Sequence, residues 1–404
     1  MPISFLSVMT GLARPDTPSS AAATASRLAY RTHASIAEIP REDWQRLLPN
    51  DPESWDYYRA VERATPPNLR LGAMTARDGE QIVALAPMFR LAYRLDTPFQ
   101  GGLRKLSDWV HERWPHLVSL PVVGLGSPMS DNCSIGFAPQ FNPQHCCEAF
   151  DGMLAHLHRD ASGDGSLLMT IKSLGAQGDI LQEPLERHGY NRVTSVPLVV
   201  LDLPFRSLDD YLATLRPKTA AYLRRKYRAA AKIRTEYRAS IAGLEQQIYA
   251  LFQSTLRQSA VDYGEFEQLT PDYFPAVLAG LGDRAQVMLC WHGDDLVSFQ
   301  LSLIGPDRIV TKHIGMKYPE ARNLNLYFVN WLKLIEFAIA NRIPTVEMGA
   351  TTYATKLLFG GQLDRRWLYF RFRRRVSNAV LRPIAPLFDF ERHDPELRRL
   401  ADRV

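Results

Sequence analysis

Residues 288–300, Met-Leu-Cys-Trp-His-Gly-Asp-Asp-Leu-Val-Ser-Phe-Gln, align without gaps on residues 74–86, Met-Thr-Ala-Arg-Asp-Gly-Glu-Gln-Ile-Val-Ala-Leu-Ala. Each segment joins two apolar runs through a turn that contains glycine, which is the pattern of a β-hairpin. Both segments follow stretches with helical periodicity. The match therefore predicts a duplicated α/β domain, with halves at 31–205 and 206–376. Two unrelated hairpins that share turn chemistry are the alternative.

The composition is typical of a globular protein, and the chain is long enough to form two hydrophobic cores. The chain has 404 residues, of which 46% are hydrophobic and 23% charged. No run of about 18 uncharged apolar residues predicts a transmembrane helix. Residues 1–30 are rich in Ser, Ala, Thr and Pro without a basic start, which favours a disordered lead-in over a signal peptide. We expect a cytoplasmic protein that could also bind peripherally at the inner membrane.

Metal and redox chemistry find no support in the sequence. The four cysteines include the adjacent pair Cys146 and Cys147, whose spacing suits neither a zinc site nor a CxxC motif. Histidines and acidic residues are not spaced as metal ligands. We therefore expect reduced thiols, no metal and no permanently bound cofactor.

The second half shows a readable order of elements. Helices at 243–260 and 271–281 precede an antiparallel meander over 286–315. A helix over 324–341 follows, then a strand at 345–349, a short helix near 354–359 and a strand at 366–373. This order predicts an α/β (α+β) domain with a mixed, mainly antiparallel sheet flanked by helices.

This order resembles the GNAT acyltransferase fold, and the tandem halves resemble the FemAB-like and CelD-like branch of that superfamily. The resemblance rests on residues 211–232, 297–316 and 337–361, with residues 125–136 in the first half. It implies two GNAT-like lobes of which the C-terminal one carries the chemistry. The branch includes enzymes that N-acylate lipid amines, and the whole pattern is similar to bacterial ceramide synthases.

The resemblance implies an N-acyltransferase that moves an acyl group from acyl-CoA or acyl-carrier protein to an amine, with a long-chain acyl group and a sphingoid-type lipid amine as first choice. One alternative is an aminoacyl-tRNA-dependent ligase of peptide bridges. Another is a non-catalytic protein that binds anionic membranes or nucleic acid.

In a GNAT fold two neighbouring strands splay to hold the donor, and a helix N-terminus takes its phosphates. The equivalent stretch here is 315–327, where Arg322, Asn323 and Asn325 are candidate cofactor-binding residues. No glycine lies between 316 and 348, unlike the glycine-rich loop of the family. That departure puts free CoA in doubt and keeps a carrier protein or tRNA open. An ordinary capped helix is the structural alternative.

Glu347, Tyr353 and Lys356 form the candidate catalytic group. Glu347 follows an apolar strand and could take a proton from the amine. Tyr353 could protonate the leaving thiolate, and Lys356, which matches the family pattern in this loop, could stabilise an oxyanion or bind a phosphate. A structural ion pair between Glu347 and Lys356 is the alternative.

His313 is a second candidate base because an ordinary histidine titrates near neutral pH, and it faces the cleft if Lys312 faces outward. A histidine satisfied in the core is the alternative. Asp131, in Ser130-Asp-Asn-Cys, is a candidate substrate-binding residue between the lobes. The alternative is a carboxylate that caps a turn.

A basic helical arm is predicted over 207–238. Ser207 caps its start and Pro217 divides it into two helices. Arg224 and Arg225 are its candidate substrate-binding residues. Such an arm could dock a carrier protein, tRNA or an anionic membrane, or form a solvated helix face. The tail, 377–404, continues with apolar residues suited to a bilayer or to packing.

Overall fold

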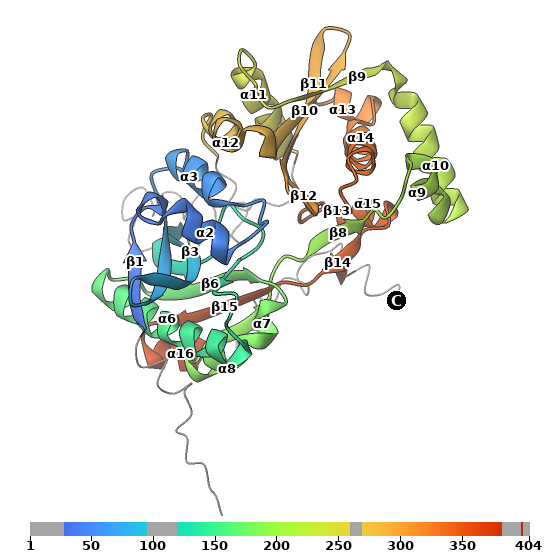
Figure 1. The fold of residues 1–404 in the computed structure, drawn as a ribbon. Helices are drawn as coiled ribbons and strands as arrows, with labels where there is room; N and C mark the ends of the chain where they lie inside the picture. Colours follow the sequence, from blue (N-terminus) through green and yellow to red (C-terminus); the bar gives the residue numbers. More distant parts are fainter. Residues whose placement is uncertain (1–27, 95–118, 259–268, 382–396, 399–404) are drawn as a thin grey trace, which may run out of the picture.

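The structure is a computed structural model that describes residues 28–94, 119–258, 269–381 and 397–398. It forms two lobes, each built on one sheet with helices on both faces (Figure 1). The predicted lead-in over residues 1–27 and most of the predicted tail lie outside the described residues. Within those two predicted segments, a strand already begins at Ala29, and a helix covers Arg375–Leu381.

The sheet of the N-terminal lobe has the order β1-β2-β3-β4-β6-β15-β7, with the short β5 paired to β3. Its strands are β1 (Ala29–His33), β2 (Leu69–Asp78), β3 (Gln81–Arg94), β4 (Ser119–Leu125), β5 (Gly136–Phe137), β6 (Leu168–Leu174), β7 (Asn191–Thr194) and β15 (Trp367–Phe372). The helices of this lobe are α2 (Arg41–Leu47), α3 (Trp55–Arg63), α6 (Pro143–Gly163), α7 (Gln177–Ile180), α8 (Gln182–Arg187) and α16 (Arg375–Leu381).

The sheet of the C-terminal lobe has the order β14-β8-β13-β12-β11-β10-β9. Its strands are β8 (Leu198–Asp202), β9 (Ile233–Arg238), β10 (Ala285–His292), β11 (Asp295–Ile304), β12 (Arg308–Met316), β13 (Thr345–Glu347) and β14 (Gln362–Asp364). The helices of this lobe are α9 (Leu208–Thr214), α10 (Pro217–Ala229), α11 (Glu245–Leu256), α12 (Tyr273–Leu281), α13 (Glu320–Asn323), α14 (Leu326–Ala340) and α15 (Tyr353–Leu358).

Read from β1 and from β9, the two sheets have the same plan. Each has an antiparallel run, then a parallel neighbour reached through a long helix, α6 or α14. Both predicted hairpins are present, as β2–β3 and β10–β11. The fold is the predicted one, a pair of mixed, mainly antiparallel sheets flanked by helices.

The lobes exchange one strand each. After β7 the chain enters the second sheet as β8, between β13 and β14, and after β14 it returns as β15, between β6 and β7. The short strands on either side of residues 195–197 therefore belong to different sheets, with β7 ending at Thr194 and β8 beginning at Leu198. The division proposed near residue 205 does not follow the sheets, because each sheet is completed by the other half of the chain.

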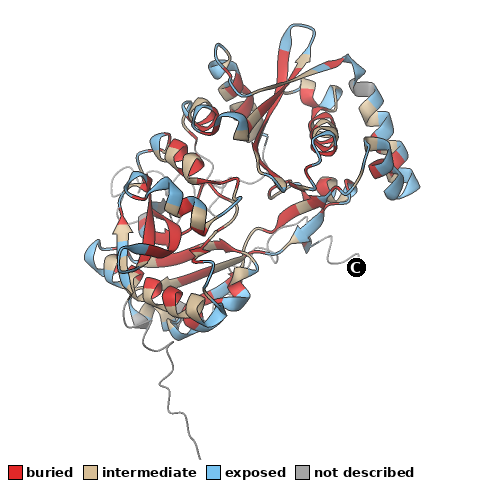
Figure 2. Ribbon diagram, viewed as in Figure 1, coloured by how far each residue is buried: buried red, intermediate tan, exposed pale blue. Residues whose placement is uncertain are grey.

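The cores lie between sheet and helices in both lobes, and the central strands are the most buried parts of the ribbon (Figure 2). One continuous cluster of buried side chains runs from the N-terminal lobe into α11 and α12, and α12 packs on α3. A second cluster lies under α14. Since the first core is shared, the lobes are joined by packing as well as by strand exchange.

The basic arm is helical over α9 and α10, as predicted, but the prediction of a helical arm to residue 238 was wrong at its end, because Ile233–Arg238 pair with β10 as strand β9. The Ser207 hydroxyl accepts a hydrogen bond from the backbone of Asp210, and Pro217 is the first residue of α10. A backbone N–H is unnecessary at a first helical position, which is why proline starts this helix rather than breaking it. No described helix is long and apolar enough to cross a bilayer.

Candidate active site

The parallel strands of the C-terminal lobe separate after a short pairing. β12 and β13 are in register from Arg308 and Thr345 to Val310 and Glu347, but β12 continues to Met316. After Glu347 the chain keeps its pairing with β8 alone, where the Met348 N–H donates to the Val199 carbonyl at 2.7 Å. Beyond Val310 no described strand pairs with that edge of β12, so β12 and β13 diverge in a V, which we call the opening.

The end of β12 leads through α13 to the N-terminus of α14. Asn325 precedes the helix in the left-handed conformation, with φ 55°, and its side chain does not cap the helix. The Lys226 ammonium from α10 donates to Asn325 Oδ1. A helix N-terminus beside a cation is suited to a phosphate group. Arg322 and Asn323 are exposed on α13, and Arg322 donates to the side chain of Gln258 at 3.2 Å.

A β-bulge in β12 places two consecutive side chains on one face. Leu301 of β11 pairs with His313 and Ser302 pairs with Thr311, so Lys312 is the extra residue. A bulge breaks the alternation of a strand. Lys312 therefore does not face outward, although the interpretation of His313 from the sequence required that it should. Its side chain is 3% exposed and points toward the N-terminal lobe.

Lys312 forms a buried ion pair between the lobes. Its ammonium lies 2.5 Å from Glu53 Oε1 and donates to the Met129 carbonyl at 2.9 Å, and Ser130 also donates to the Glu53 carboxylate. Burial disfavours the ammonium, but Glu53, Tyr273 and Asp131 outweigh it and raise the pKa of Lys312. The pair fixes the loop at 127–133 against β12.

His313 packs among aromatic side chains. Its ring centroid is 5.2 Å from that of Tyr273 and 5.6 Å from that of Phe252. Burial, aided by the charge of Lys312, lowers the pKa of His313 to about 3. The expectation that this histidine titrates near neutral pH was wrong, because desolvation of the imidazolium outweighs the attraction of Asp131. A neutral His313 can accept a hydrogen bond but is a weak base.

Glu347 is the titratable group best matched to proton transfer near neutral pH. Burial raises its pKa to about 7, and the carboxylates of Glu53 and Asp131 add to the shift. Among the described residues, no side chain or backbone group forms a hydrogen bond or ion pair with its carboxylate. The supposed ion pair with Lys356 is thus not formed, and Glu347 remains available to a substrate.

Asp131 reaches the mouth of the opening from the N-terminal lobe. A Cβ atom on Gly349 would lie 3.6 Å from Asp131 Oδ2. Burial by itself would raise the pKa of this carboxyl, but the nearby ammonium groups of Lys312, Lys172 and Lys356 lower it. Asp131 is therefore an anion held between the lobes, close to Glu347.

Lys356 and Tyr353 are buried in α15, behind the loop that follows β13. Lys356 is 4% exposed, and its ammonium donates to the carbonyls of Ala350 at 2.5 Å and Gly349 at 3.1 Å. The Tyr353 hydroxyl donates to the Pro197 carbonyl at 3.2 Å. Both side chains hold the backbone that carries Gly349 at the opening.

A row of buried polar atoms lies under the sheet beside this opening. Among the described residues, four side chains here have polar atoms without a hydrogen-bond partner: Gln300, Ser302, Thr311 and, through its indole N–H, Trp331. Buried polar groups are rarely left unpaired.

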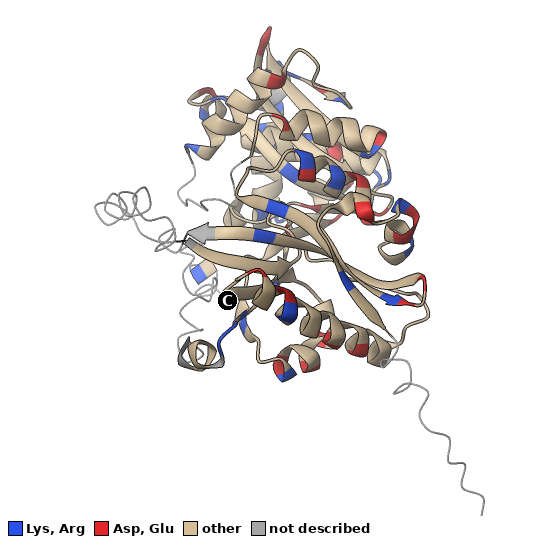
Figure 3. Ribbon diagram, turned by 90° about the vertical axis from the view of Figure 1, so that its left-hand side faces the viewer, with Lys and Arg blue, Asp and Glu red and all other residues tan. Residues whose placement is uncertain are grey.

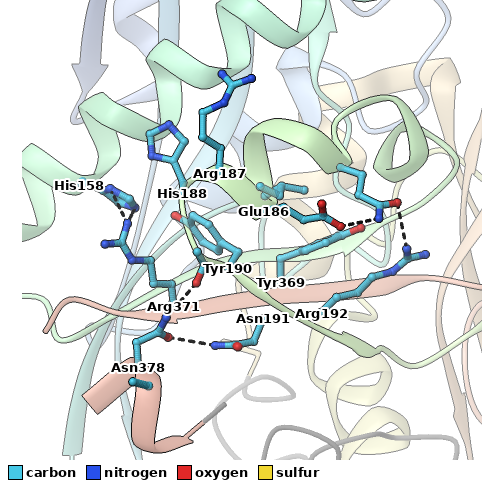
Figure 4. Close-up of a pocket in the computed structure, with 14 residues that line it drawn as sticks. His158, Glu186, Arg187, His188, Tyr190, Asn191, Arg192, Tyr369, Arg371 and Asn378 are labelled. Atoms are coloured by element: carbon cyan, nitrogen blue, oxygen red, sulfur yellow. Dashed lines mark hydrogen bonds between the residues drawn. The ribbon is translucent and has the colours of Figure 1, made fainter. Parts of the chain in front are cut away.

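Two cavities lined by described residues lie outside this opening. One, of about 530 Å³, lies between the lobes and is lined in part by Asp51, Arg308 and Arg366, the last two being cations that oppose the raised pKa of Glu347. The other, of about 1090 Å³, lies at the β7–β15 edge of the N-terminal lobe (Figure 4). Its Arg187 is paired with Asp151 and Glu183, and none of the predicted site residues lines it.

Arg224 and Arg225 lie apart from the opening, on the exposed side of α10. The structure thus brings together Glu347, Asp131 and His313 around the opening, with Lys356 and Tyr353 behind it and Asn325 at the start of α14. Sequence reasoning missed Glu53, Lys312 and Lys172 as interlobe residues, and it missed the particular role of Lys226. Only Lys312 had a local signal, its position next to His313.

Comparison with known proteins agrees with this geometry. Residues 217–357 match the family model described as the acetyltransferase (GNAT) domain. The C-terminal lobe carries a GNAT acyltransferase domain. The matched region runs from α10 to α15 and so includes the opening, Glu347 and Lys356.

Solved structures are similar to the whole chain at low identity. FemX has a TM-score of 0.53 and 10% identity, over 82% of this chain and 96% of that one. The C-terminal domain of a protein described as a lysylphosphatidylglycerol synthetase, from Agrobacterium fabrum, has a TM-score of 0.52 and 12% identity, over 86% and 94%. These likenesses show the tandem fold alone. No curated protein sequence matches this chain.

Proposed function

We propose that the GNAT domain transfers an acyl group from a phosphate-bearing donor to an amine held between the lobes, forming an amide. The observation that carries the proposal is the placement of Glu347, with a pKa of about 7, where β12 and β13 separate. A general base works best when its pKa lies near the working pH.

The roles follow from position. The donor would occupy the opening, with a phosphate at the start of α14 near Lys226 and its carbonyl near Thr311. Asp131 would bind the incoming amine as its ammonium, which gives one proton to solvent to become the neutral nucleophile. The amine nitrogen then bonds to the acyl carbon as the carbon–sulfur bond breaks, and Glu347 accepts the second proton that the nitrogen loses in this step. The thiolate leaves and takes a proton from solvent.

Orientation supplies most of the rate in this scheme, with backbone N–H groups of β12 as donors to the oxyanion. Lys356 and Tyr353 act as positioning residues, because their polar atoms bind the backbone around the opening. His313 lines the acceptor side as a neutral ring.

The first substrates to test are palmitoyl-CoA and a sphingoid base, the pair that the resemblance to bacterial ceramide synthases implies. Mass spectrometry should detect an N-acyl product with the wild-type chain, and Glu347→Gln should reduce its rate by about 100-fold or more. Equal rates from both proteins would count against the proposal.

Aminoacyl-tRNA is the second candidate donor. The exposed cations of α10, close to the proposed phosphate site, favour a polyanionic carrier over a small one. Transfer of an aminoacyl group to an amine by the wild-type chain, with none from palmitoyl-CoA, would select this alternative.

A further inference from the structure

The outward side of α10 carries several cations, and the helix itself contains no acidic residue. Lys218, Arg224, Arg225 and Arg228 are exposed, and we call these four the basic face of α10. No aspartate or glutamate occurs between residues 211 and 235. Figure 3 shows basic and acidic residues interspersed over the side of the molecule that it presents.

The basic face is weakly engaged within the protein. Arg224 lies 3.9 Å from Asp209, in a pair whose side chains are 44% and 89% exposed, and Arg225 stacks near Tyr222. Among the described residues, Lys218 and Arg228 have no hydrogen-bond or ion-pair partner. Like charges on one helix face repel one another, and an anionic partner would remove that repulsion.

The opposite side of α10 is fixed to the donor site. The Tyr222 and Phe328 rings lie 5.5 Å apart, and Tyr227 donates to Glu336 of α14 at 2.9 Å. Lys226 reaches the start of α14 at Asn325. The two sides of one helix therefore connect an exposed basic surface with the proposed phosphate site.

We propose that the basic face of α10 docks an acidic helix of an acyl carrier protein, which delivers its acyl-phosphopantetheine past Lys226 into the opening between β12 and β13. This inference rests on the acyl transfer proposed above and names the carrier for that same site.

Charge and shape favour an acidic protein helix. From Lys218 to Arg228 the face extends about 15 Å along one helix. Carboxylates at positions three and four apart on a partner helix have a similar spacing. The Lys226 ammonium lies at the start of α14, and no glycine lies between 316 and 348, which suits the single phosphate of phosphopantetheine better than the three phosphates of CoA.

The same face fits the other polyanions less well. It has no exposed aromatic ring on which a nucleotide base could stack, since Tyr222 and Tyr227 face α14. It also has no large apolar side chain to enter a bilayer, because the uncharged positions on that side of α10 are Pro217 and Ala221.

The test compares two donors and two charge variants. Palmitoyl-carrier protein and palmitoyl-pantetheine, which lacks both protein and phosphate, are each assayed by mass spectrometry with a sphingoid base. With Lys218→Glu/Arg228→Glu, we expect kcat/KM for the carrier protein to fall at least about tenfold, and that for palmitoyl-pantetheine to stay within about twofold. Lys218→Arg/Arg228→Lys keeps the charge and should retain both activities.

The outcomes separate the two proposals. Product from palmitoyl-pantetheine with no preference for the carrier protein, or an equal loss with both donors, would overturn the docking while leaving acyl transfer intact. No product from any donor would overturn both. Vesicles of phosphatidylglycerol that bind the wild-type chain but not the charge-reversed variant, with carrier-protein turnover unchanged, would assign the face to a membrane instead.

Discussion

In the N-terminal lobe, β4 pairs with β6 through four residues to its end at Leu125, whereas in the C-terminal lobe β12 pairs with β13 through three residues and then leaves it. Close contact keeps the first pair together, since a Cβ atom on Gly124 would lie 2.5 Å from Thr170. The loop that follows β4 then bonds to the end of β6, where the Cys133 N–H donates to the Ser173 carbonyl at 3.0 Å.

The difference shows how one duplicated plan came to carry one site. The N-terminal lobe fills the corresponding position with its own loop, and that loop brings Asp131 and the Met129 carbonyl to the other lobe. The N-termini of α6 and α14 also differ, since only the first is closed by a side-chain cap. Asn142 caps α6 by accepting from the His145 N–H at 2.9 Å, while the start of α14 is approached by Lys226.

The sharpest test of this comparison is the carboxylate that only the C-terminal lobe places at its opening. Glu347→Gln should lower kcat by about 100-fold or more, because the base is lost. The wild-type rate should rise with pH through about 7, as Glu347 loses its proton, and this limb should vanish in the variant. The control Glu336→Gln removes a carboxylate bound to Tyr227 and Lys333, and should change kcat by less than about twofold.

Ionisation of Glu347 is expected to raise the rate but to lower the stability of the folded protein. A carboxyl whose pKa is raised in the folded state favours folding below its unfolded pKa, and that advantage is lost as pH rises through about 7. Glu347→Gln should therefore stabilise the protein at pH 8 by on the order of 1–3 kcal/mol, and by little at pH 4. Urea denaturation at the two pH values measures this, and equal effects at both would contradict the assigned pKa.

The buried pair between the lobes tests how firmly the loop is held. Lys312→Met should destabilise the protein by about 3–5 kcal/mol, because Glu53 would be left buried without its cation. Glu53→Gln/Lys312→Met should recover most of that loss. If the double variant were as unstable as the single one, packing rather than charge would account for the effect.

The starts of α14 and α6 should respond differently to loss of a side chain. Lys226→Ala should raise KM for a phosphate-bearing donor by about tenfold, since a charge-assisted bond to phosphate is lost, with kcat little changed. Lys226→Arg should restore most of the affinity. An unchanged KM would show that the donor phosphate does not bind at the start of α14.

The smallest effect is expected at α6. Asn142→Ala should cost about 1 kcal/mol of stability, because the cap is lost. Urea denaturation measures that cost, and KM for every donor should be unaffected. A raised KM would mean that the N-terminal lobe also binds the donor.

Several features were predictable because they depend on neighbours in sequence. Both hairpins, the cap at Ser207 and the helix start at Pro217 follow from turn and capping chemistry. Glu347 was predicted as a base from its place at a strand end. Its pKa was not, because burial and the carboxylates of Glu53 and Asp131 come from other elements.

The sequence by itself determined the duplicated α/β plan, the basic arm and the strand end that carries Glu347, since periodicity, turns and caps act over a few residues. Tertiary structure alone decided which strands separate and which two strands the lobes exchange. It also decided that Lys312 is buried and His313 neutral, because the bulge in β12 and the packing of α12 set their surroundings. Desolvation and long-range pairing depend on groups hundreds of residues apart, and no local pattern records them.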